Sequence, residues 1–300
     1  MKLAFVTPWY GNIPGGAESE CRRTVENLQK HGIEVEILTT CIKEFLSDWN
    51  TDFYEEGIYN LNGVNIRRFS VRKRDTVRFD KINYKLMHGL KISPEEEKTF
   101  MREMVNSPGL YSYIAEHGVD YDYFLFIPYM FGTTYYGSCI YPEKSVLIPC
   151  LHDESYAYLN IYKTMFENVK GVIFHAFPEK ILANQLYNLN NRQTVLGEGI
   201  DMDFVYNPDR FREKYGIKND FILYAGRKEA GKNVPLLIDF FARYKKHRNN
   251  ELKLVLIGSG TIEIPSENRN DIIDLGFVPL QDKYDAYSAA TFLCQPSLNE

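Results

Sequence analysis

Two cations stand where an apolar stretch of the chain gives way to a helical pattern. The run Phe221–Ala225 has the composition of a buried strand and is followed by Gly226 and Arg227. Lys232 comes six residues after Gly226, and apolar residues at helical spacing begin with Val234. In an open parallel α/β sheet, ligands bind at the carboxyl ends of the strands, and a helix N-terminus there favours an anion. We therefore expect the planar fork of Arg227 and the compact charge of Lys232 to hold a diphosphate.

Two neighbours of this pair carry expectations of their own. Asn233 stands just before the predicted helix, which has Pro235 in its first turn, so Asn233 is expected to cap the helix. Lys228 lies next to Arg227 and is expected to face solvent. The alternative for Arg227 and Lys232 is that both are solvated charges on a loop.

A pair of glycines lies between the first predicted strand and the first predicted helix. Gly15 and Gly16 let the backbone come close to a ligand, and their amides can face an anion at the helix end. Glu18 follows them closely. The spacing is not the GxGxxG fingerprint of dinucleotide-binding proteins, and the alternative is an ordinary turn.

Three further sites end predicted strands in the second half of the chain. Gly258 would let the backbone approach a nucleotide, with a tight turn as the alternative. Phe277 and Val278 would present backbone groups to a nucleobase, with a simple strand end as the alternative. Glu300 is an acid that would contact sugar hydroxyls or the reacting carbon, although the residue pattern alone favours the alternative that it has no such role.

A histidine and a carboxylate follow the predicted strand Ser145–Cys150. His152 can donate a hydrogen bond to a sugar hydroxyl, and Asp153 beside it can orient an acceptor hydroxyl. The alternative is that Asp153 or Ser155 caps the next helix. His175 lies within an apolar run and is expected to be a structural or loop histidine.

Size and composition limit the class of protein. Three hundred residues suggest two domains, 1–200 and 201–300, and 44% apolar with 25% charged residues is typical of a soluble globular protein. The net charge of −5 argues against nucleic-acid binding. Five scattered cysteines without a CxxC motif favour buried thiols in a reducing compartment over disulfides or a metal site.

Strand and helix patterns alternate along the whole chain, which predicts an α/β fold of two Rossmann-like, doubly wound parallel sheets. Ser93-Pro94-Glu95-Glu96 has the composition of a helix start. The chain ends just after a predicted strand whose covering helix is missing, so the second domain is expected to be incomplete. The predicted strands are Leu3–Thr7, Val35–Thr39, Val64–Phe69, Tyr123–Ile127, Ser145–Cys150, Val172–Phe174, Phe221–Ala225, Leu254–Ile257, Ile272–Leu275 and Phe292–Gln295.

Residues 67–91 form a basic segment within an acidic protein. A patch of this kind suits an anionic membrane surface or a lipid diphosphate, and a plain solvated face is the alternative. Its cations are Arg67, Arg68, Arg72, Lys73, Arg74, Arg78, Lys81, Lys85 and Lys91.

Together these motifs resemble the retaining, two-Rossmann (GT-B type) glycosyltransferases of the "glycosyl transferases group 1" family, over essentially the whole chain. The matching segments are Gly15-Gly16-x-Glu18, Leu151–Glu154, Gly197–Asp201, Gly226-Arg227 with Lys232-Asn233, and Gln295–Glu300. The chain departs from the family at Glu198, where the hinge usually has Asn. The second glutamate of the family's Glu-x7-Glu motif, like its C-terminal helix, falls beyond residue 300, so the resemblance implies weak donor binding or no turnover by these residues alone.

The resemblance assigns roles to the residues singled out above. The catalytic residues that it implies are His152, Arg227, Lys232 and Glu300. The donor-binding residues are Arg227, Lys232 and Glu300 again, together with Gly15, Gly16, Gly226, Gly258, Phe277 and Val278. The acceptor-side residues are Glu18 and Asp153. The implied reaction moves a sugar, with retention, from a nucleotide-diphosphate sugar to a carbohydrate or lipid-linked glycan acceptor in bacterial cell-surface polysaccharide or glycolipid synthesis. The implied reaction needs no metal and no further cofactor. It would take place in the cytoplasm or on the inner face of the membrane. A nucleotide-sugar epimerase and a non-catalytic nucleotide-binding module are the alternatives.

Overall fold

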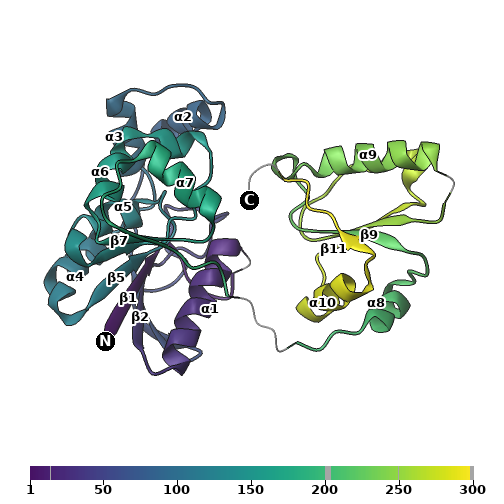
Figure 1. Ribbon diagram of the computed structural model, residues 1–300. Coiled ribbons are helices and arrows are strands. Elements are labelled where there is room, and N and C mark those ends of the chain that lie inside the picture. Colours follow the sequence, from purple (N-terminus) through teal and green to yellow (C-terminus); the bar gives the residue numbers. More distant parts are fainter. Residues whose placement is uncertain (14, 200–203, 249, 298–300) are drawn as a thin grey trace. The chain divides into compact units, whose positions relative to one another are not determined.

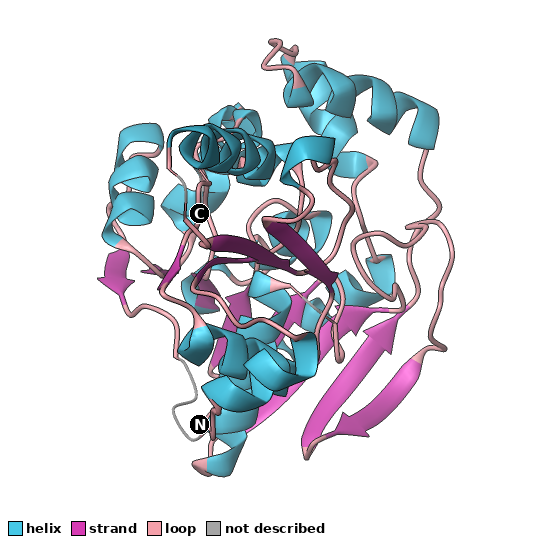
Figure 2. Cartoon of the chain, turned by 90° about the vertical axis from the view of Figure 1, so that its right-hand side faces the viewer, coloured by secondary structure: helices cyan, strands magenta, loops and turns pink. Residues whose placement is uncertain are grey.

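The computed structural model describes residues 1–13, 15–199, 204–248 and 250–297 (Figure 1). The chain forms two compact units, Met1–Gly199 and Ile200–Glu300. Helices and strands alternate in both of them (Figure 2). The fold class predicted from this alternation is confirmed.

The first unit contains an eight-stranded sheet of order β3-β4-β2-β1-β5-β6-β7-β8. Every neighbouring pair is parallel except β3 and β4, which form an antiparallel hairpin. The strands are β1 (Lys2–Thr7), β2 (Glu34–Thr40), β3 (Gly57–Leu61), β4 (Val64–Phe69), β5 (Tyr123–Phe126), β6 (Ser145–Leu147), β7 (Gly171–Phe174) and β8 (Arg192–Val195).

Alternate residues of the central strand β1 enter two different cores. Leu3 and Phe5 pack with α1 on one face of the sheet, whereas Ala4 and Val6 belong to the larger core formed with the helices that follow β4. The helices are α1 (Gly16–Lys30), α2 (Thr76–Met87), α3 (Pro94–Arg102), α4 (Pro108–His117), α5 (Gly132–Ser138), α6 (Asn160–Asn168) and α7 (Phe177–Leu186). Both faces of the sheet are covered, and in open α/β sheets of this kind ligands bind at the carboxyl ends of the strands.

The second unit contains a parallel sheet of order β11-β10-β9-β12. Helices α8 and α10 pack on one face and α9 packs on the other (Figure 1). The elements are α8 (Pro208–Tyr215), β9 (Phe221–Ala225), α9 (Val234–His247), β10 (Lys253–Ile257), β11 (Ile272–Gly276), α10 (Leu280–Ala289) and β12 (Phe292–Leu293).

Local sequence signals account for several element ends. Ser93 caps α3 in a capping box with Glu96, and Pro94 stands in the first turn, as the sequence predicts. Asn62 and Gly63 take positive φ of 55° and 86° in the turn between β3 and β4, the conformation that a two-residue hairpin requires.

Several details differ from the sequence-based prediction. The predicted strands Ser145–Cys150 and Phe292–Gln295 are shorter, because β6 ends at Leu147 and β12 at Leu293. The cysteines are not uniformly buried, since Cys139 is exposed and Cys294 half-buried, although the thiols are free. None of the described helices is long and apolar enough to cross a membrane.

Candidate functional site

The strand ends of the second unit are joined by backbone hydrogen bonds at the carboxyl edge of the sheet. Gly226 N–H donates to Ile257 O (3.0 Å), and Gly258 N–H donates to Gly276 O (2.8 Å). The loop after β9 is tied to the loop after β10 by a further bond, from Lys228 N–H to Ser259 O (2.8 Å). This edge is therefore a continuous, closely packed backbone surface.

Gly258 is a glycine for two physical reasons. Its φ is 129°, a conformation that L side chains rarely adopt, and a Cβ there would lie 1.9 Å from the carbonyl oxygen of Gly226. The close approach of β9 and β10 at this point depends on the missing side chain. Whether a nucleotide contacts Gly226 or Gly258 stays a prediction.

Lys228 is buried, so the prediction that it faces solvent is wrong. Its side chain is 1% exposed, and its Nζ atom lies 2.6 Å from Asp274 Oδ1 in β11. A buried ammonium requires such a partner, and Asp274 also accepts a hydrogen bond from Gly276 N–H (2.9 Å). The error arose because the sequence does not reveal a partner 46 residues away.

Arg227 is an exposed residue just after the end of β9. Its side chain is 65% exposed and its Nη2 atom lies 3.3 Å from Glu229 Oε1. Lys232 is half-buried on the same connection, immediately before α9. The predicted start of α9 near Val234 is confirmed, so both cations stand between a strand end and a helix start.

Asn233 does not cap α9 through its side chain, contrary to the prediction. It adopts the left-handed conformation with φ 53°, and its Nδ2 atom donates to Pro296 O (3.0 Å). Asn233 thus ties the connection between β9 and α9 to the segment after β12, where Gln295 donates to Ala225 O (2.8 Å). Glu300, the predicted acid beyond this segment, lies outside the described residues.

The segment after β11 presents one exposed and one buried apolar side chain. Phe277 is exposed, whereas Val278 lies in the core between the sheet and α10. The side chain of Val278 therefore packs in the core, and only the backbone N–H and C=O groups of this residue could contact a nucleobase. The nucleobase site stays a prediction.

In the first unit, a carboxylate already stands at the N-terminus of α1. Gly15 precedes the helix and Gly16 is its first residue. Glu18 Oε1 accepts a hydrogen bond from Trp9 Nε1 (2.8 Å), and a Cβ on Gly15 would lie 2.0 Å from Glu18 Oε2. The Glu18 carboxylate thus lies beside Gly15, where the helix dipole favours negative charge.

His152 and Asp153 lie on the loop after β6, and both are exposed. Asp153 accepts a hydrogen bond from Tyr158 OH (2.8 Å). The short helix Ser155–Tyr158 has no side-chain cap, so the alternative that Asp153 or Ser155 caps a helix there is wrong. Glu154 points inward, where burial raises the pKa of its carboxyl, and it accepts a hydrogen bond from Tyr129 OH (3.1 Å).

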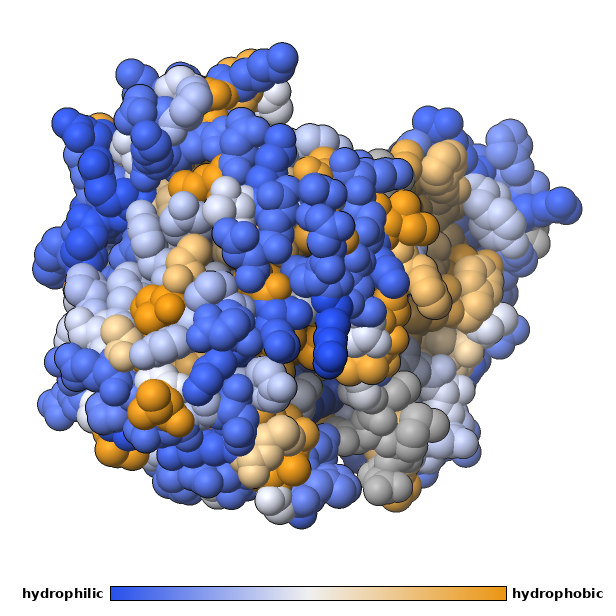
Figure 3. Space-filling model, turned by 60° about the vertical axis from the view of Figure 1, so that its left-hand side comes forward, coloured by the Kyte–Doolittle hydropathy of each residue, from blue (hydrophilic) through white to orange (hydrophobic). Residues whose placement is uncertain are grey.

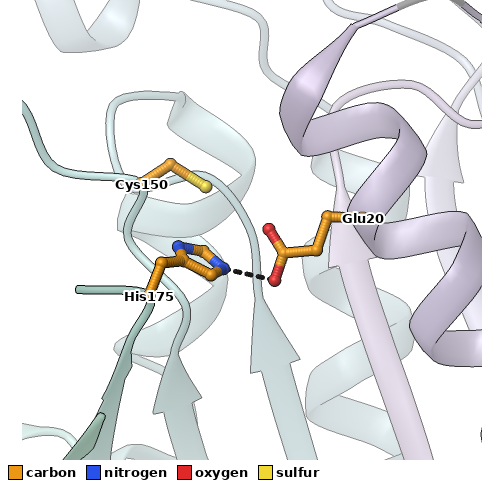
Figure 4. A group of neighbouring side chains, drawn as sticks. All are labelled: Glu20, Cys150 and His175. Carbon is orange, nitrogen blue, oxygen red and sulfur yellow. Dashed lines mark hydrogen bonds and ion pairs between the residues drawn. The ribbon is translucent and has the colours of Figure 1, made fainter. Parts of the chain in front are cut away.

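A cluster that the sequence did not predict lies at the same edge of the sheet. His175 follows β7, Cys150 follows β6, and Glu20 comes from α1 (Figure 4). His175 Nε2 is hydrogen-bonded to Glu20 Oε1. Burial lowers the pKa of His175, but the hydrogen bond and the charge of Glu20 outweigh that effect and raise it. The chain order gave no signal for this cluster, because its members are brought together by the strand order β1-β5-β6-β7.

Most of the basic segment is engaged within the first unit. Arg67 pairs with Glu36 (3.0 Å), Arg72 with Glu103 (2.9 Å) and Lys85 with Glu96 (2.5 Å). Arg68 is buried and donates to backbone carbonyls. Hydrophilic residues make up most of the face in Figure 3, and groups of apolar residues interrupt them.

The comparisons with known proteins agree with this architecture. Residues 207–300 match the model of the family described as "Glycosyl transferases group 1". An uncharacterized glycosyltransferase of Methanocaldococcus jannaschii is 26% identical over 326 residues, covering 100% of this chain and 75% of that protein.

Solved structures show the same fold over nearly the whole chain. A sucrose-phosphate synthase from Thermosynechococcus elongatus has a TM-score of 0.65 at 15% identity, covering 99% of this chain and 75% of that one. WaaG, a glycosyltransferase involved in lipopolysaccharide biosynthesis, has a TM-score of 0.59 at 15% identity with the same coverage. The two-Rossmann GT-B fold that the motifs suggested is thus confirmed, and residues 207–300 match the glycosyl transferases group 1 family.

Proposed function

We propose that this protein transfers a sugar from a nucleotide-diphosphate sugar to a hydroxyl group of an acceptor, with retention of the anomeric configuration. The observation that carries the proposal is the position of Arg227 and Lys232 on the connection between β9 and α9. Lys228, between them, is neutralised by Asp274, whereas the Arg227 guanidinium reaches solvent. This loop therefore separates a structural cation from one that can bind a ligand.

The chemistry of the leaving group explains why cations belong here. The nucleoside diphosphate gains negative charge as the bond to the sugar breaks, so cations already in place lower the barrier. In this proposal Arg227 binds two phosphate oxygens through its fork and Lys232 adds a point charge. Glu229 holds the Arg227 side chain until the diphosphate replaces it.

The remaining donor contacts would come from backbone. Gly226 and Gly258 form a surface without side chains, which lets a nucleotide approach the strand ends closely. Phe277 is exposed beside this edge, and the backbone around it would meet the base. Glu300 would bind the sugar.

The acceptor would bind to the first unit. His152 is exposed after β6 and would donate a hydrogen bond to the transferred sugar, while Asp153 and Glu18 would orient the acceptor hydroxyl. We propose a carbohydrate or lipid-linked glycan as acceptor, used in cell-surface polysaccharide or glycolipid synthesis in the cytoplasm. Lys81 and Lys91 are exposed and would add peripheral contact with an anionic membrane surface.

A donor screen tests the proposal. The complete gene product is incubated with a panel of nucleotide-diphosphate sugars and candidate acceptors, and release of nucleoside diphosphate is measured. Arg227→Ala and Lys232→Ala should abolish most release without unfolding the protein. Arg243→Ala is the matched control, because Arg243 is an exposed arginine paired with Asp239 (2.7 Å) on the surface of α9.

Three outcomes would contradict the proposal. Full release by both loop variants would remove the assigned diphosphate site. A donor that is epimerised in the absence of any acceptor would instead favour the isomerase reaction, and no binding of any nucleoside diphosphate would favour a non-catalytic module.

A further inference from the structure

Three different metal-binding side chains converge at the carboxyl edge of the first sheet. Glu20 comes from α1, Cys150 from the loop after β6 and His175 from the loop after β7, and they point toward one another (Figure 4). One ligand atom of each lies within 4.8 Å of the other two. Because these elements are far apart in the sequence, their convergence is a property of the fold.

We propose that Glu20, Cys150 and His175 bind one zinc ion. A thiolate, an imidazole and a carboxylate are the donors that zinc takes in proteins, at about 2.0–2.3 Å, which places tetrahedral ligand atoms roughly 3.5 Å apart. The three ligand atoms lie within 4.8 Å of one another, so side-chain rotations would bring them to that spacing around an ion. The fourth position would hold a water molecule, as in other sites with three protein ligands.

One carboxylate oxygen of this cluster has no hydrogen-bond partner among the described residues. Glu20 Oε1 bonds to His175 Nε2, but Glu20 Oε2 is buried and accepts no hydrogen bond from the described residues. An inaccessible carboxylate oxygen without a donor is costly, and a cation would satisfy it. The side chains of Glu20 and His175 are 11% and 15% exposed, so water supplies little compensation.

The backbone at Cys150 is held in an unusual conformation. Its φ is 52°, the left-handed region that non-glycine residues rarely occupy. Such strain is retained where the surrounding structure imposes it, and it often marks functional positions. Here it sets the position of the thiol relative to the imidazole.

A second carboxylate fixes the two ligand-bearing loops. Glu179, in the first turn of α7, accepts hydrogen bonds from Leu151 N–H (2.8 Å) and from His175 N–H (2.7 Å). The first of these amides belongs to Leu151, the residue after Cys150, and the second belongs to His175 itself. Outer carboxylates that orient ligands in this way are a regular part of metal sites. Glu20 and Glu179 also concentrate negative charge that a divalent cation would neutralise.

Binding has a defined proton balance. When zinc binds His175 Nε2, the proton that this nitrogen donates to Glu20 is released, to Nδ1 from a neutral ring or to solvent from a protonated one, and the thiol of Cys150 loses its proton to solvent as the Zn–S bond forms. No oxidation or reduction takes part. Because His152 follows Cys150 by two residues, the bound ion would fix the loop that carries it.

Zinc binding is measured on the whole protein after chelation and gel filtration, by competition with a chromogenic chelator. The wild type should bind one zinc ion per chain. Cys150→Ser and His175→Gln should each weaken binding at least 100-fold, and Glu179→Gln should weaken it roughly 10- to 100-fold. Cys139→Ser, an exposed free thiol in the same unit, and His31→Gln, an exposed histidine, are the controls and should bind like the wild type.

Cobalt provides a readout that does not depend on variant folding. Co²⁺ added to the wild type should give thiolate-to-metal charge-transfer absorption in the near ultraviolet, which zinc should abolish. Absence of this absorption, a wild type without stoichiometric zinc, or binding that survives in folded Cys150→Ser and His175→Gln would each overturn the proposal. These readouts report metal binding and are independent of sugar transfer.

Discussion

The Nζ atom of Lys228 lies 2.6 Å from Asp274 Oδ1, and this ion pair joins the loop after β9 to strand β11. The adjacent side chain, Arg227, is directed to solvent instead. Two neighbouring cations on one loop thus differ: Lys228 is buried in an ion pair that joins two strand ends, whereas Arg227 is exposed and is the one proposed to bind an anion.

Lys228→Ala should destabilise the second unit by about 3 kcal/mol. The substitution removes a buried ammonium and leaves Asp274 without its cation, which is more costly than losing a surface pair. Urea unfolding followed by circular dichroism measures the effect. Arg227→Ala is the internal control and should change stability by no more than about 0.5 kcal/mol. Equal stability of wild type and Lys228→Ala would show that the pair has no structural role.

Arg227→Ala and Lys232→Ala should each lower the rate of diphosphate release by roughly 10²–10³-fold. In the proposed reaction each variant loses a charge that stabilises the leaving diphosphate as it becomes more negative. Steady-state kinetics with the donor found in the screen would measure kcat and KM separately. A change confined to KM would indicate that the side chain binds the donor and its transition state equally.

Gly258→Ala should destabilise the protein by roughly 3 kcal/mol, through a clash with the Gly226 carbonyl and a strained φ. Gly231→Ala is the matched substitution, because a Cβ at Gly231 would meet nothing within 4 Å. The two midpoints of thermal unfolding should therefore separate clearly. Coincident midpoints would mean that β9 and β10 can move apart at little cost.

Glu103 should make the first unit sensitive to acid. Burial raises the pKa of its carboxyl, but hydrogen bonds from Asp75 N–H (2.9 Å), Arg102 (2.7 Å) and Arg72 (2.9 Å) outweigh burial and lower it to about 2. A carboxyl whose pKa is lower in the folded state stabilises the fold above its unfolded pKa, and that contribution is lost as pH falls. We expect a loss of about 3 kcal/mol between about pH 5 and pH 2.

The Glu103→Gln variant checks this assignment. It should show a flatter dependence of unfolding free energy on pH in the same range, since the titrating group is gone. Glu95→Gln serves for comparison, because Glu95 pairs with Lys98 on the exposed surface of α3. Parallel profiles for Glu103→Gln and the wild type would assign the acid sensitivity to other carboxyls.

Local patterns located most of the strands that make up the two sheets. Apolar runs located β1, β9 and β10, and the sequence Ser93-Pro94 located the start of α3. Such local patterns do not reveal which residues far apart in the sequence contact each other in the fold. Lys228 has the appearance of a loop cation until Asp274 is placed beside it.

The cluster of Glu20, Cys150 and His175 has the same explanation. Each residue is unremarkable in its own segment, and the cluster exists because β6 and β7 are neighbours and α1 returns across the sheet edge. Strand β3 was missed for a different reason, since its residues are largely exposed and lack the apolar run that marks a buried strand.

The hydrogen bond from Trp9 to Glu18 couples the fluorescence of Trp9 to the position of the Glu18 carboxylate. An anion bound at the amides that begin α1 would compete with the Glu18 carboxylate for this position, and displacement of Glu18 would release the indole N–H. The chain has two tryptophans, Trp9 and Trp49. Fluorescence emission from Trp9 in a Trp49→Phe protein would therefore report the binding of an anion at this helix end, without any added label.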